Sequence, residues 1–248
     1  MRYAILTDIH EDIVHLKRAL KKIEKLNCDE IICLGDISGF SVPHYHYFDT
    51  RDAHECLRLV RENCSIIIAG NHDLHAAQRT PSVKSSFNFP DNWYDMDYHA
   101  RAEKAQGKIW LYDHDELDPL YTKNDVAFLK SLPEYHIIKT KEINIFLSHF
   151  IYPNLSGSMK IFLTEIDEFG QHKQFMKDHD CEIAFAGHFH FSGLYVANDH
   201  SIIGKRFNKK YNAQKNDCIL VPPIAGSRLG KGFCIYDTET NIVQTKRI

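Results

Sequence analysis

The sequence predicts an α/β protein of four layers, α/β/β/α, in which two packed sheets lie between outer helices. Three observations support this fold class. Apolar segments alternate with amphipathic segments of helical periodicity up to residue 70, and a second series of apolar segments follows residue 133. Polar residues come directly after five of the apolar segments, at the strand ends where open α/β sheets bind their ligands.

The chain up to residue 70 predicts three strands joined by two helices. A strand at Tyr3–Thr7 is followed by a helix that begins after its N-cap, Asp12, and the next strand is expected at Glu30–Leu34. A second helix over residues 50–63 and a strand at Ser65–Ala69 complete the unit. Because this order favours parallel strands with crossover connections, we expect the three C-terminal strand ends to meet at one edge.

Residues 76–133 interrupt the alternation and are expected to form an insert, or cap, with helices near Tyr98–Tyr112 and Lys123–Leu132. Its aromatic side chains either stack a nucleobase beside the functional site or form the insert's own core, and the core interpretation is slightly favoured. These side chains are Phe87, Phe89, Trp93, Tyr94, Tyr98, Trp110, Tyr112 and Tyr121. The acidic run Asp113, Asp115, Glu116 and Asp118 is expected to be a solvated turn.

The chain after the insert predicts a second series of strands. We expect strands at Glu134–Lys139, Glu142–Ser148 and Glu182–Ala186, with an amphipathic helix near Ile166–Asp178. Five short strands follow, at Tyr195–Ala197, Ser201–Ile203, Cys218–Val221, Gly232–Tyr236 and Ile242–Thr245. Because no repeat, low-complexity tract or linker divides the chain, we predict a single domain over residues 1–248, with the insert at about 76–133.

The composition is that of an ordinary globular protein and excludes several classes of function. With 44% hydrophobic and 25% charged residues and a formal charge of −3, the chain has no basic field that would capture nucleic acid non-specifically. No apolar stretch is long enough to span a membrane, and a strand begins at Arg2, which leaves no room for a signal peptide. Seven cysteines without a CxxC pair indicate reduced thiols in a cytoplasmic protein.

Five polar clusters, each at the end of an expected strand, contain the residues needed to hold two metal ions. A carboxylate such as that of Asp36 can bridge two ions, because each of its oxygens can serve a different one. Asn71 offers a neutral carbonyl oxygen, and His188 and His190 both face the cluster if Phe189 points away. The clusters are Asp8-Ile9-His10, Gly35-Asp36, Gly70-Asn71-His72-Asp73, His149 and Gly187-His188-Phe189-His190.

The ordered set D-x-H, G-D, G-N-H-D, H and G-H-x-H resembles the calcineurin-like metallophosphoesterase family over residues 8–190. Each motif alone is weak, whereas the full set in this order is highly specific. Finer features resemble a bacterial and archaeal phosphodiesterase-like branch: the segment Gly35–Phe40, the helix end Phe128–Pro133, and Pro222-Pro223 followed by Gly226-Ser227. The resemblance implies a metallophosphoesterase-like sandwich that hydrolyses a small phosphoester, with a phosphodiesterase as the leading hypothesis and a nucleotide-containing substrate as one option.

Transferred residue by residue, the resemblance implies two divalent metal ions that share Asp36. One ion would be held by Asp8, His10, Asp36 and His190, and the other by Asp36, Asn71, His149 and His188. His72 matches the family position that does not bind metal and donates to the phosphoryl oxygen or protonates the leaving group. Asp73 would orient His72 and keep it protonated.

The implied reaction is attack on phosphorus by a hydroxide that bridges the two ions, with His72 assisting departure of the alkoxide. The mixed carboxylate, amide and imidazole ligands suit Mn, Fe, Zn or Ni, among which the sequence does not choose, and they disfavour a magnesium site.

Several alternatives stay open. A phosphomonoesterase or a dinucleotide polyphosphate hydrolase is the second hypothesis for the reaction, because the fold does not separate these activities. A non-catalytic binding module, such as the retromer subunit built on this fold, is disfavoured because His72 and all ligand positions are present. A nuclease is disfavoured by the negative net charge. The sequence leaves the oligomeric state open, a homo-oligomer included.

Three further features of the sequence carry weaker expectations. His75 is expected to be structural or a substrate contact rather than a metal ligand. The basic loop 205–215 is expected to be exposed, and Arg228 is a candidate contact for an anion.

Overall fold

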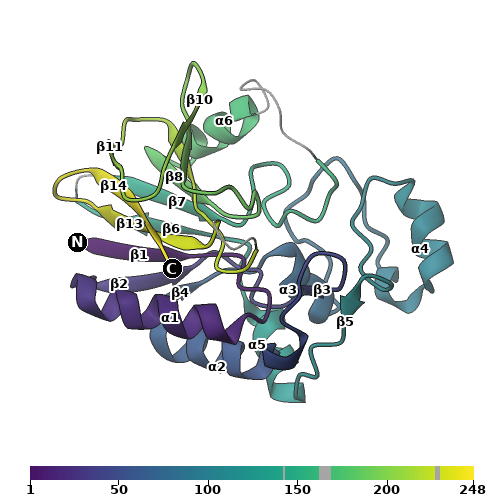
Figure 1. The fold of residues 1–248 in the computed structure, drawn as a ribbon. Helices are drawn as coiled ribbons and strands as arrows, with labels where there is room; N and C mark the ends of the chain where they lie inside the picture. Colours follow the sequence, from purple (N-terminus) through teal and green to yellow (C-terminus); the bar gives the residue numbers. More distant parts are fainter. Residues whose placement is uncertain (142, 162–168, 227–229) are drawn as a thin grey trace.

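The computed structural model describes residues 1–248 with the exception of 142, 162–168 and 227–229. Two six-stranded sheets lie face to face (Figure 1). The first has the order β11-β14-β13-β1-β2-β4 and consists of Lys210–Asn212, Ile242–Arg247, Gly232–Asp237, Arg2–Leu6, Glu30–Cys33 and Ile66–Ile67. The second has the order β10-β9-β12-β8-β7-β6 and consists of Ile202–Lys205, Leu194–Ala197, Asp217–Leu220, Ile183–Ala186, Asn144–Ser148 and Tyr135–Lys139.

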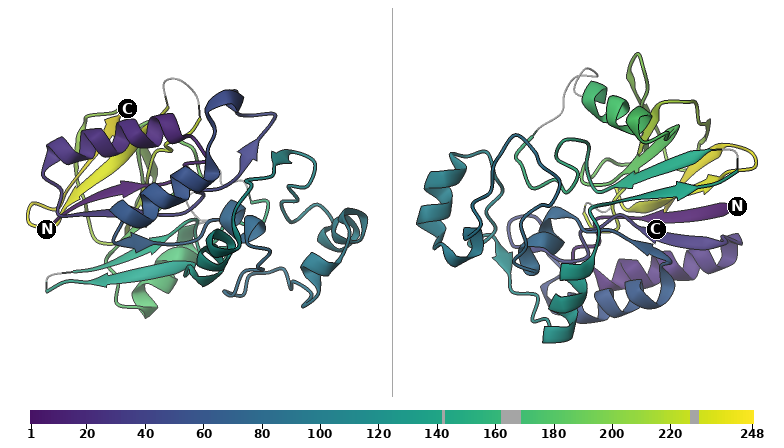
Figure 2. Two further views of the ribbon diagram at one scale, coloured as in Figure 1. Left: turned by 90° about the horizontal axis from the view of Figure 1, so that it is seen from below. Right: turned by 180° about the vertical axis from the view of Figure 1, so that it is seen from behind.

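Helices cover the outer face of each sheet (Figure 1, Figure 2). Three of them, α1 (Ile13–Ile23), α2 (Ala53–Asn63) and α5 (Lys123–Ser131), share one apolar core with the first sheet. α6 (Gly170–Asp178) packs on the second sheet. The predicted α/β/β/α arrangement is therefore confirmed. Among the helices of the described residues, none combines the length and apolar character needed to cross a membrane.

A central core holds the two sheets together. Ile5 of β1, Leu147 of β7 and Phe185 of β8 are buried in it, and the rings of Phe185 and Tyr236 lie 5.2 Å apart across the interface. Burying side chains of this size stabilises the fold by about 1.5–3 kcal/mol each. Because the contact joins both sheets, it also fixes the relative position of their strand ends.

Parallel strands place the polar clusters at one end of the sandwich. β1, β2 and β4 are parallel to one another, and so are β7, β8 and β12. The register pairs Leu6 with Cys33 in the first sheet and Ser148 with Ala186 in the second. Neighbouring parallel strands therefore end at the same height in the sheet. The residues that directly follow these strands become neighbours in space.

The insert extends to one side of the sandwich (Figure 1). It contains α4 (Tyr98–Ala105), and Trp93 and Ile109 are buried in a small core of its own. Its strand β5 (Glu116–Leu117) pairs antiparallel with β3 (Phe40–Ser41), which lies in the loop after β2. This two-stranded ribbon ties the insert to the end of the first sheet. Among the residues that the structure describes, the remaining helices are α3 (Asn71–Ala76) and the 3₁₀ helices Glu24–Leu26, Phe48–Thr50 and Trp93–Asp95.

Some boundaries differ from the prediction. α4 ends at Ala105 instead of continuing to residue 112, because Gln106 and Gly107 have φ values of 47° and 73°, a left-handed conformation that ends helices. The sequence does not predict β3, β5, β11 or α3, since elements of two to six residues show little periodicity. Parts of the expected segments Glu142–Ser148 and Ile166–Asp178 lie outside the described residues, and so does Arg228.

Candidate metal centre

Left-handed turns bring the predicted ligands together at the strand ends. The five residues Asp8, His10, Asp36, His188 and His190 have φ values between 46° and 67°. A non-glycine residue in this conformation costs on the order of 1 kcal/mol, and such residues concentrate at functional sites. Five of the seven predicted metal ligands therefore have a strained backbone conformation.

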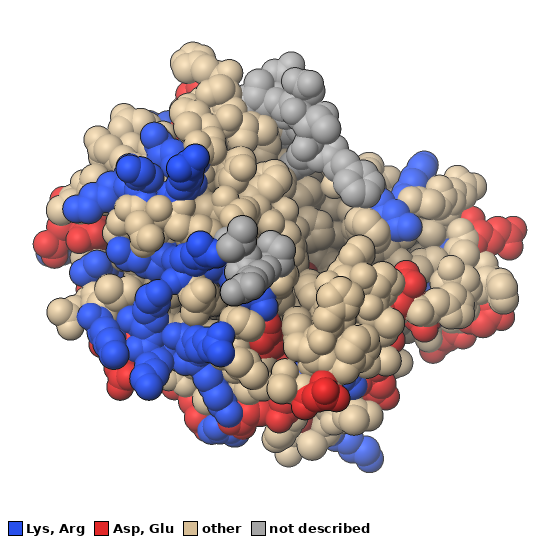
Figure 3. Space-filling model, in the orientation of Figure 1, with Lys and Arg blue, Asp and Glu red and all other residues tan. Residues whose placement is uncertain are grey.

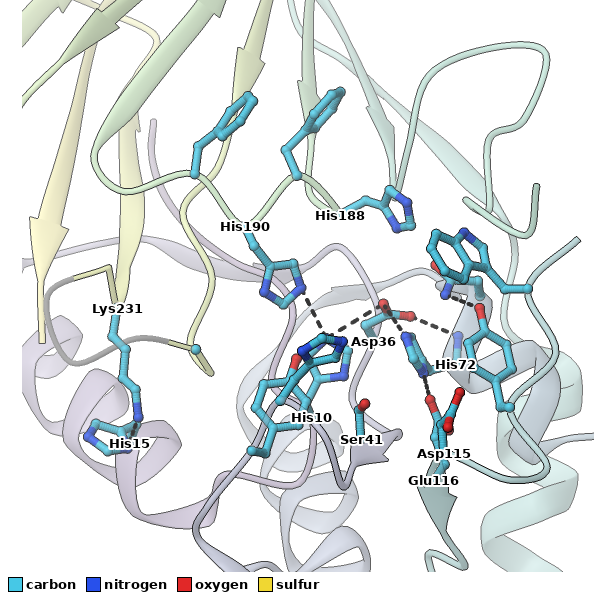
Figure 4. Close-up of a pocket in the computed structure, with 18 of the residues that line it drawn as sticks. His10, His15, Asp36, Ser41, His72, Asp115, Glu116, His188, His190 and Lys231 are labelled. Atoms are coloured by element: carbon cyan, nitrogen blue, oxygen red, sulfur yellow. Dashed lines mark hydrogen bonds and ion pairs between the residues drawn. The ribbon is translucent and has the colours of Figure 1, made fainter. Parts of the chain in front are cut away.

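A first group of donor atoms comes from the loops after β1 and β8 (Figure 4). His190 Nε2 lies 3.2 Å from Asp8 Oδ1 and 3.2 Å from His10 Nε2. His10 Nδ1 lies 2.9 Å from the Gly39 carbonyl oxygen, to which it can donate. With the proton on Nδ1, the lone pair of His10 Nε2 faces the group, which is the usual arrangement of a metal-binding histidine.

A second group joins the two sheets. His149 Nε2 lies 3.0 Å from Asp36 Oδ2 and 3.2 Å from His188 Nδ1, and the His149 ring is held by the Leu34 carbonyl oxygen, 2.8 Å from Nδ1. Asp36 Oδ2 also lies 3.8 Å from His10 Nε2 of the first group. The Asp36 carboxylate thus lies between the two groups.

The carboxylates in this cluster are buried, and positive charges beside them stabilise their ionised form. Burial lowers the pKa of His10 and of His188 to about 3, so both rings are neutral near pH 7. Burial opposes ionisation of Asp36, yet its pKa lies below the usual range because His149 and other imidazoles surround it. Burial likewise opposes the charge on His149, whose pKa is nevertheless raised to about 9 by Asp36. Divalent ions would supply the positive charge that these carboxylates attract.

Asn71 provides the observation that tests whether metal ions fit here. Its Nδ2 donates to the Tyr112 hydroxyl oxygen over 2.5 Å, which fixes the orientation of the amide. Its Oδ1 is buried and has no hydrogen-bond partner among the described residues, although buried carbonyl oxygens rarely lack one. An ideal Cβ on Gly157 would lie 2.7 Å from this oxygen and 2.7 Å from His188 Nδ1, so both donors face the same small space. The carboxylate, amide and imidazole donors fit divalent transition-metal ions.

His72 lies beside the donor groups, with Nε2 3.8 Å from Asp36 Oδ2. Its Nδ1 forms an ion pair with Glu116 of the insert (Figure 4). Burial lowers the pKa of His72, but Glu116 and Asp36 outweigh that effect and raise it to about 9. Glu116 was expected in a solvated turn. The structure corrects this, because its side chain is 9% exposed.

The charge of Asp73 contributes to raising the pKa of His72, as expected, but the Asp73 carboxylate does not hold the His72 ring. Its Oδ1 accepts from the amides of Ile37 and Ser38, both at 3.0 Å, and its Oδ2 accepts from the Gly70 amide at 3.1 Å. These bonds join the loop after β2 to the start of α3. Asp73 therefore positions the backbone that carries Asp36 and Asn71, whereas the carboxylate that contacts the His72 ring belongs to Glu116.

A large pocket of about 1360 Å³ opens over the donor groups. The aromatic residues of the insert lie in two places. Trp93, Phe87 and Phe89 pack in the core of the insert, while Trp110 and Tyr112 line the pocket. His75 packs against the Tyr112 ring at 4.9 Å, in a structural position.

A four-layer sandwich with carboxylate, amide and imidazole donors at its strand ends defines a class of metal-dependent phosphoester hydrolases. The family model for the calcineurin-like phosphoesterases matches residues 1–192, and the chain belongs to this family.

Two solved structures have a similar fold. A metallophosphoesterase from Sphaerobacter thermophilus is 20% identical with a TM-score of 0.67, covering 100% of this chain and 88% of that one. A hypothetical protein from Pyrococcus horikoshii is 16% identical with a TM-score of 0.59, covering 100% and 87%. An uncharacterized protein from Methanocaldococcus jannaschii is 31% identical over 70 residues, which are 28% of this chain and 25% of that protein. This last match thus spans a quarter of the relative's length.

Replacing Gly157 by alanine is expected to weaken metal binding at the second group by about tenfold or more, because the added methyl would push Asn71 Oδ1 and His188 Nδ1 apart. Gly107→Ala is the matched control: Gly107 has a φ of 73° against 80° for Gly157, but a Cβ there meets nothing within 4 Å. Calorimetric titration of both variants with Mn²⁺ separates the clash from backbone strain. Equal affinities in the two variants would show that Gly157 does not shape the site.

Proposed function

We propose that this protein is a dinuclear-metal phosphodiesterase that acts on a small phosphoester. One ion is assigned to Asp8, His10, Asp36 and His190, and the other to Asp36, Asn71, His149 and His188. The observation that supports this best is the position of the Asp36 carboxylate, whose Oδ2 lies 3.0 Å from His149 Nε2 and 3.8 Å from His10 Nε2. When bound, two divalent ions polarise phosphoryl oxygens and lower the pKa of a bound water.

The chain's own residues supply what the metal ions do not. The Nδ1 atom of His72 forms an ion pair with Glu116. The other ring nitrogen, Nε2, therefore faces the donor groups and the space above them. A proton held at Nε2 is available to the phosphoryl oxygen or to the departing alkoxide, the role of a general acid. Phe150, Phe189 and Phe191 form an apolar wall of the pocket, which limits the access of water on that side.

The shape of the pocket favours a diester over a monoester. From the donor groups it continues toward Trp110 and Leu111 on one side and toward Lys231 and Arg18 on the other. A phosphate at the metal ions would therefore have room for a substituent in both directions. A monoester would leave one of these directions unused.

Hydrolysis of a dinucleotide polyphosphate is a second candidate, favoured by the charge at one end of the pocket. Lys231, Arg18 and Arg247 line that end, and Lys and Arg side chains gather on the adjoining face (Figure 3). Asp12 neutralises part of this charge, because its Oδ2 lies 3.0 Å from Lys231 Nζ. The remaining cations would suit a substrate with further phosphates beyond the scissile one.

The proposed function is tested by the rates at which the Mn²⁺-loaded protein hydrolyses three substrates of different class. We expect bis(4-nitrophenyl) phosphate to be hydrolysed faster than 4-nitrophenyl phosphate. A dinucleoside tetraphosphate hydrolysed faster than both would favour the second candidate. Absence of hydrolysis with all three substrates, in protein shown to contain bound manganese, would contradict the proposed function.

A further inference from the structure

We infer that the insert completes the catalytic machinery, because Glu116 on β5 positions the ring of His72. This inference rests on the proposed function for the role of His72, but the contact itself is independent of it. Glu116 would be a positioning residue: it acts on the reaction through the orientation of His72 and does not itself touch the substrate.

The contact between the two side chains is sheltered from solvent. Glu116 Oε1 and His72 Nδ1 form an ion pair, and the side chains are 9% and 15% exposed (Figure 4). Both of these atoms are buried. An ion pair at the protein surface contributes little, whereas one that is shielded from water restricts the geometry of both partners.

The β3–β5 ribbon delivers Glu116 to this position. Glu116 pairs with Ser41 in the ribbon, two residues after Gly39. The His72 ring lies directly on the backbone of Gly39, where an added Cβ would overlap its imidazole atoms. The ring of Tyr112, four residues before Glu116, lies 4.5 Å from the His72 ring on another side. The His72 ring is thus enclosed by the β3–β5 ribbon and by the segment that leads into β5, here called the approach segment.

The approach segment also orients Asn71, the residue before His72 in the sequence. Tyr112 Oη accepts from Asn71 Nδ2 at 2.5 Å, so Asn71 Oδ1 is left facing the donor groups. Tyr112 and Glu116 therefore reach two consecutive residues, Asn71 and His72, from one short stretch of the insert. Contacts of this kind to metal ligands and functional histidines commonly change activity or affinity by about 10- to 100-fold when removed.

The consequence for His72 is a fixed ring orientation. With Nδ1 held in the ion pair with the Glu116 carboxylate, Nε2 is the nitrogen that faces Asp36 and the reaction space. Asp73 does not perform this task, because its oxygens accept from the backbone amides of Ile37, Ser38 and Gly70. The proposed positioning role therefore falls to Glu116.

The kinetic test uses Glu116→Leu, which removes the acceptor, and Glu116→Gln, which keeps a neutral acceptor of the same length. On a phenyl phosphodiester, Glu116→Leu is expected to lower kcat by about 10- to 100-fold at unchanged KM and metal content. Glu116→Gln should recover part of this loss, and 4-nitrophenyl esters should be less affected because their leaving group needs less protonation. Glu103→Leu, the same change at an exposed glutamate on α4 of the insert, is expected to change kcat less than twofold, roughly the effect of an ordinary surface substitution.

A second measurement does not depend on activity. In ¹⁵N-histidine-labelled protein without metal, a proton on Nδ1 of His72 that is hydrogen-bonded to Glu116 should give a downfield ring N–H signal, which His72→Gln assigns by its loss. The signal should disappear in Glu116→Leu and persist in Glu103→Leu. Should Glu116→Leu fail to fold, Glu116→Asp shortens the carboxylate by one methylene and is expected to weaken the signal and kcat together.

The outcomes separate this inference from the proposed function. If the wild type hydrolyses no phosphoester but shows the ring N–H signal and loses it in Glu116→Leu, the proposed function fails and the positioning contact stands. If the wild type is active and Glu116→Leu keeps both kcat and the signal, the positioning role is overturned. An equal loss of kcat in Glu116→Leu and Glu103→Leu would also overturn it.

Discussion

Replacing Asp36 by asparagine is expected to lower phosphodiester hydrolysis by about a thousandfold or more, because metal ions contribute several kcal/mol of charge stabilisation and this carboxylate serves both of them. The change is nearly isosteric, and an asparagine Oδ1 can still accept from the His72 amide, as Asp36 Oδ1 does at 3.0 Å. Metal analysis should show fewer bound ions than in the wild type.

Asp49→Asn is the control for loss of one acidic group, since Asp49 is exposed and has no ion pair among the described residues. It is expected to retain wild-type activity and metal content. If Asp36→Asn kept full metal content and rate, the assignment of Asp36 as the shared ligand would be wrong.

Replacing His72 by glutamine is expected to separate catalysis from metal binding. Because His72 is assigned no metal, the variant should keep its metal content while kcat falls on the order of 10²- to 10⁴-fold, the usual contribution of a general acid. The loss should be larger for esters with poor leaving groups. Metal analysis of the variant checks the first part of this prediction. Measuring kcat on one ester with a good leaving group and one with a poor leaving group checks the second.

His75→Gln is the matched control for this experiment. His75 lies on the same short helix, and its ring also packs against Tyr112, at 4.9 Å. It is expected to leave kcat within about threefold of the wild type, as is usual for a residue outside the reaction. Full activity of His72→Gln would remove His72 from the mechanism, and loss of its metal would instead make it a ligand.

The cluster of donor residues could be anticipated from the sequence because it depends on features that sequence shows well. Buried parallel strands such as β1 and β2 appear as apolar runs, and the residues after them must meet wherever strands are parallel and in register. The topology predicts that Asp8, Asp36 and Asn71 are neighbours. The role of Asp36 as a shared ligand was implied by the resemblance to the family.

The partner of His72 could not be anticipated in the same way. Glu116 lies 44 positions further along the chain, in an acidic run without periodicity, and reaches the site through a ribbon of two-residue strands. A carboxylate next in sequence to the histidine, Asp73, was the simpler choice. The first turn of α3 directs it instead to the amides of Ile37, Ser38 and Gly70, a result of local helix geometry that residue type alone does not reveal.

The central claim is that two metal ions sharing Asp36 are needed for hydrolysis of a phosphodiester. It is tested most directly by adding Mn²⁺ in measured equivalents to metal-free protein while following both bound manganese and the hydrolysis of bis(4-nitrophenyl) phosphate. We predict that activity stays low while the first equivalent binds and rises as the second binds, because the reaction needs both ions. Full activity with a single bound equivalent, or hydrolysis without any bound metal, would contradict this account.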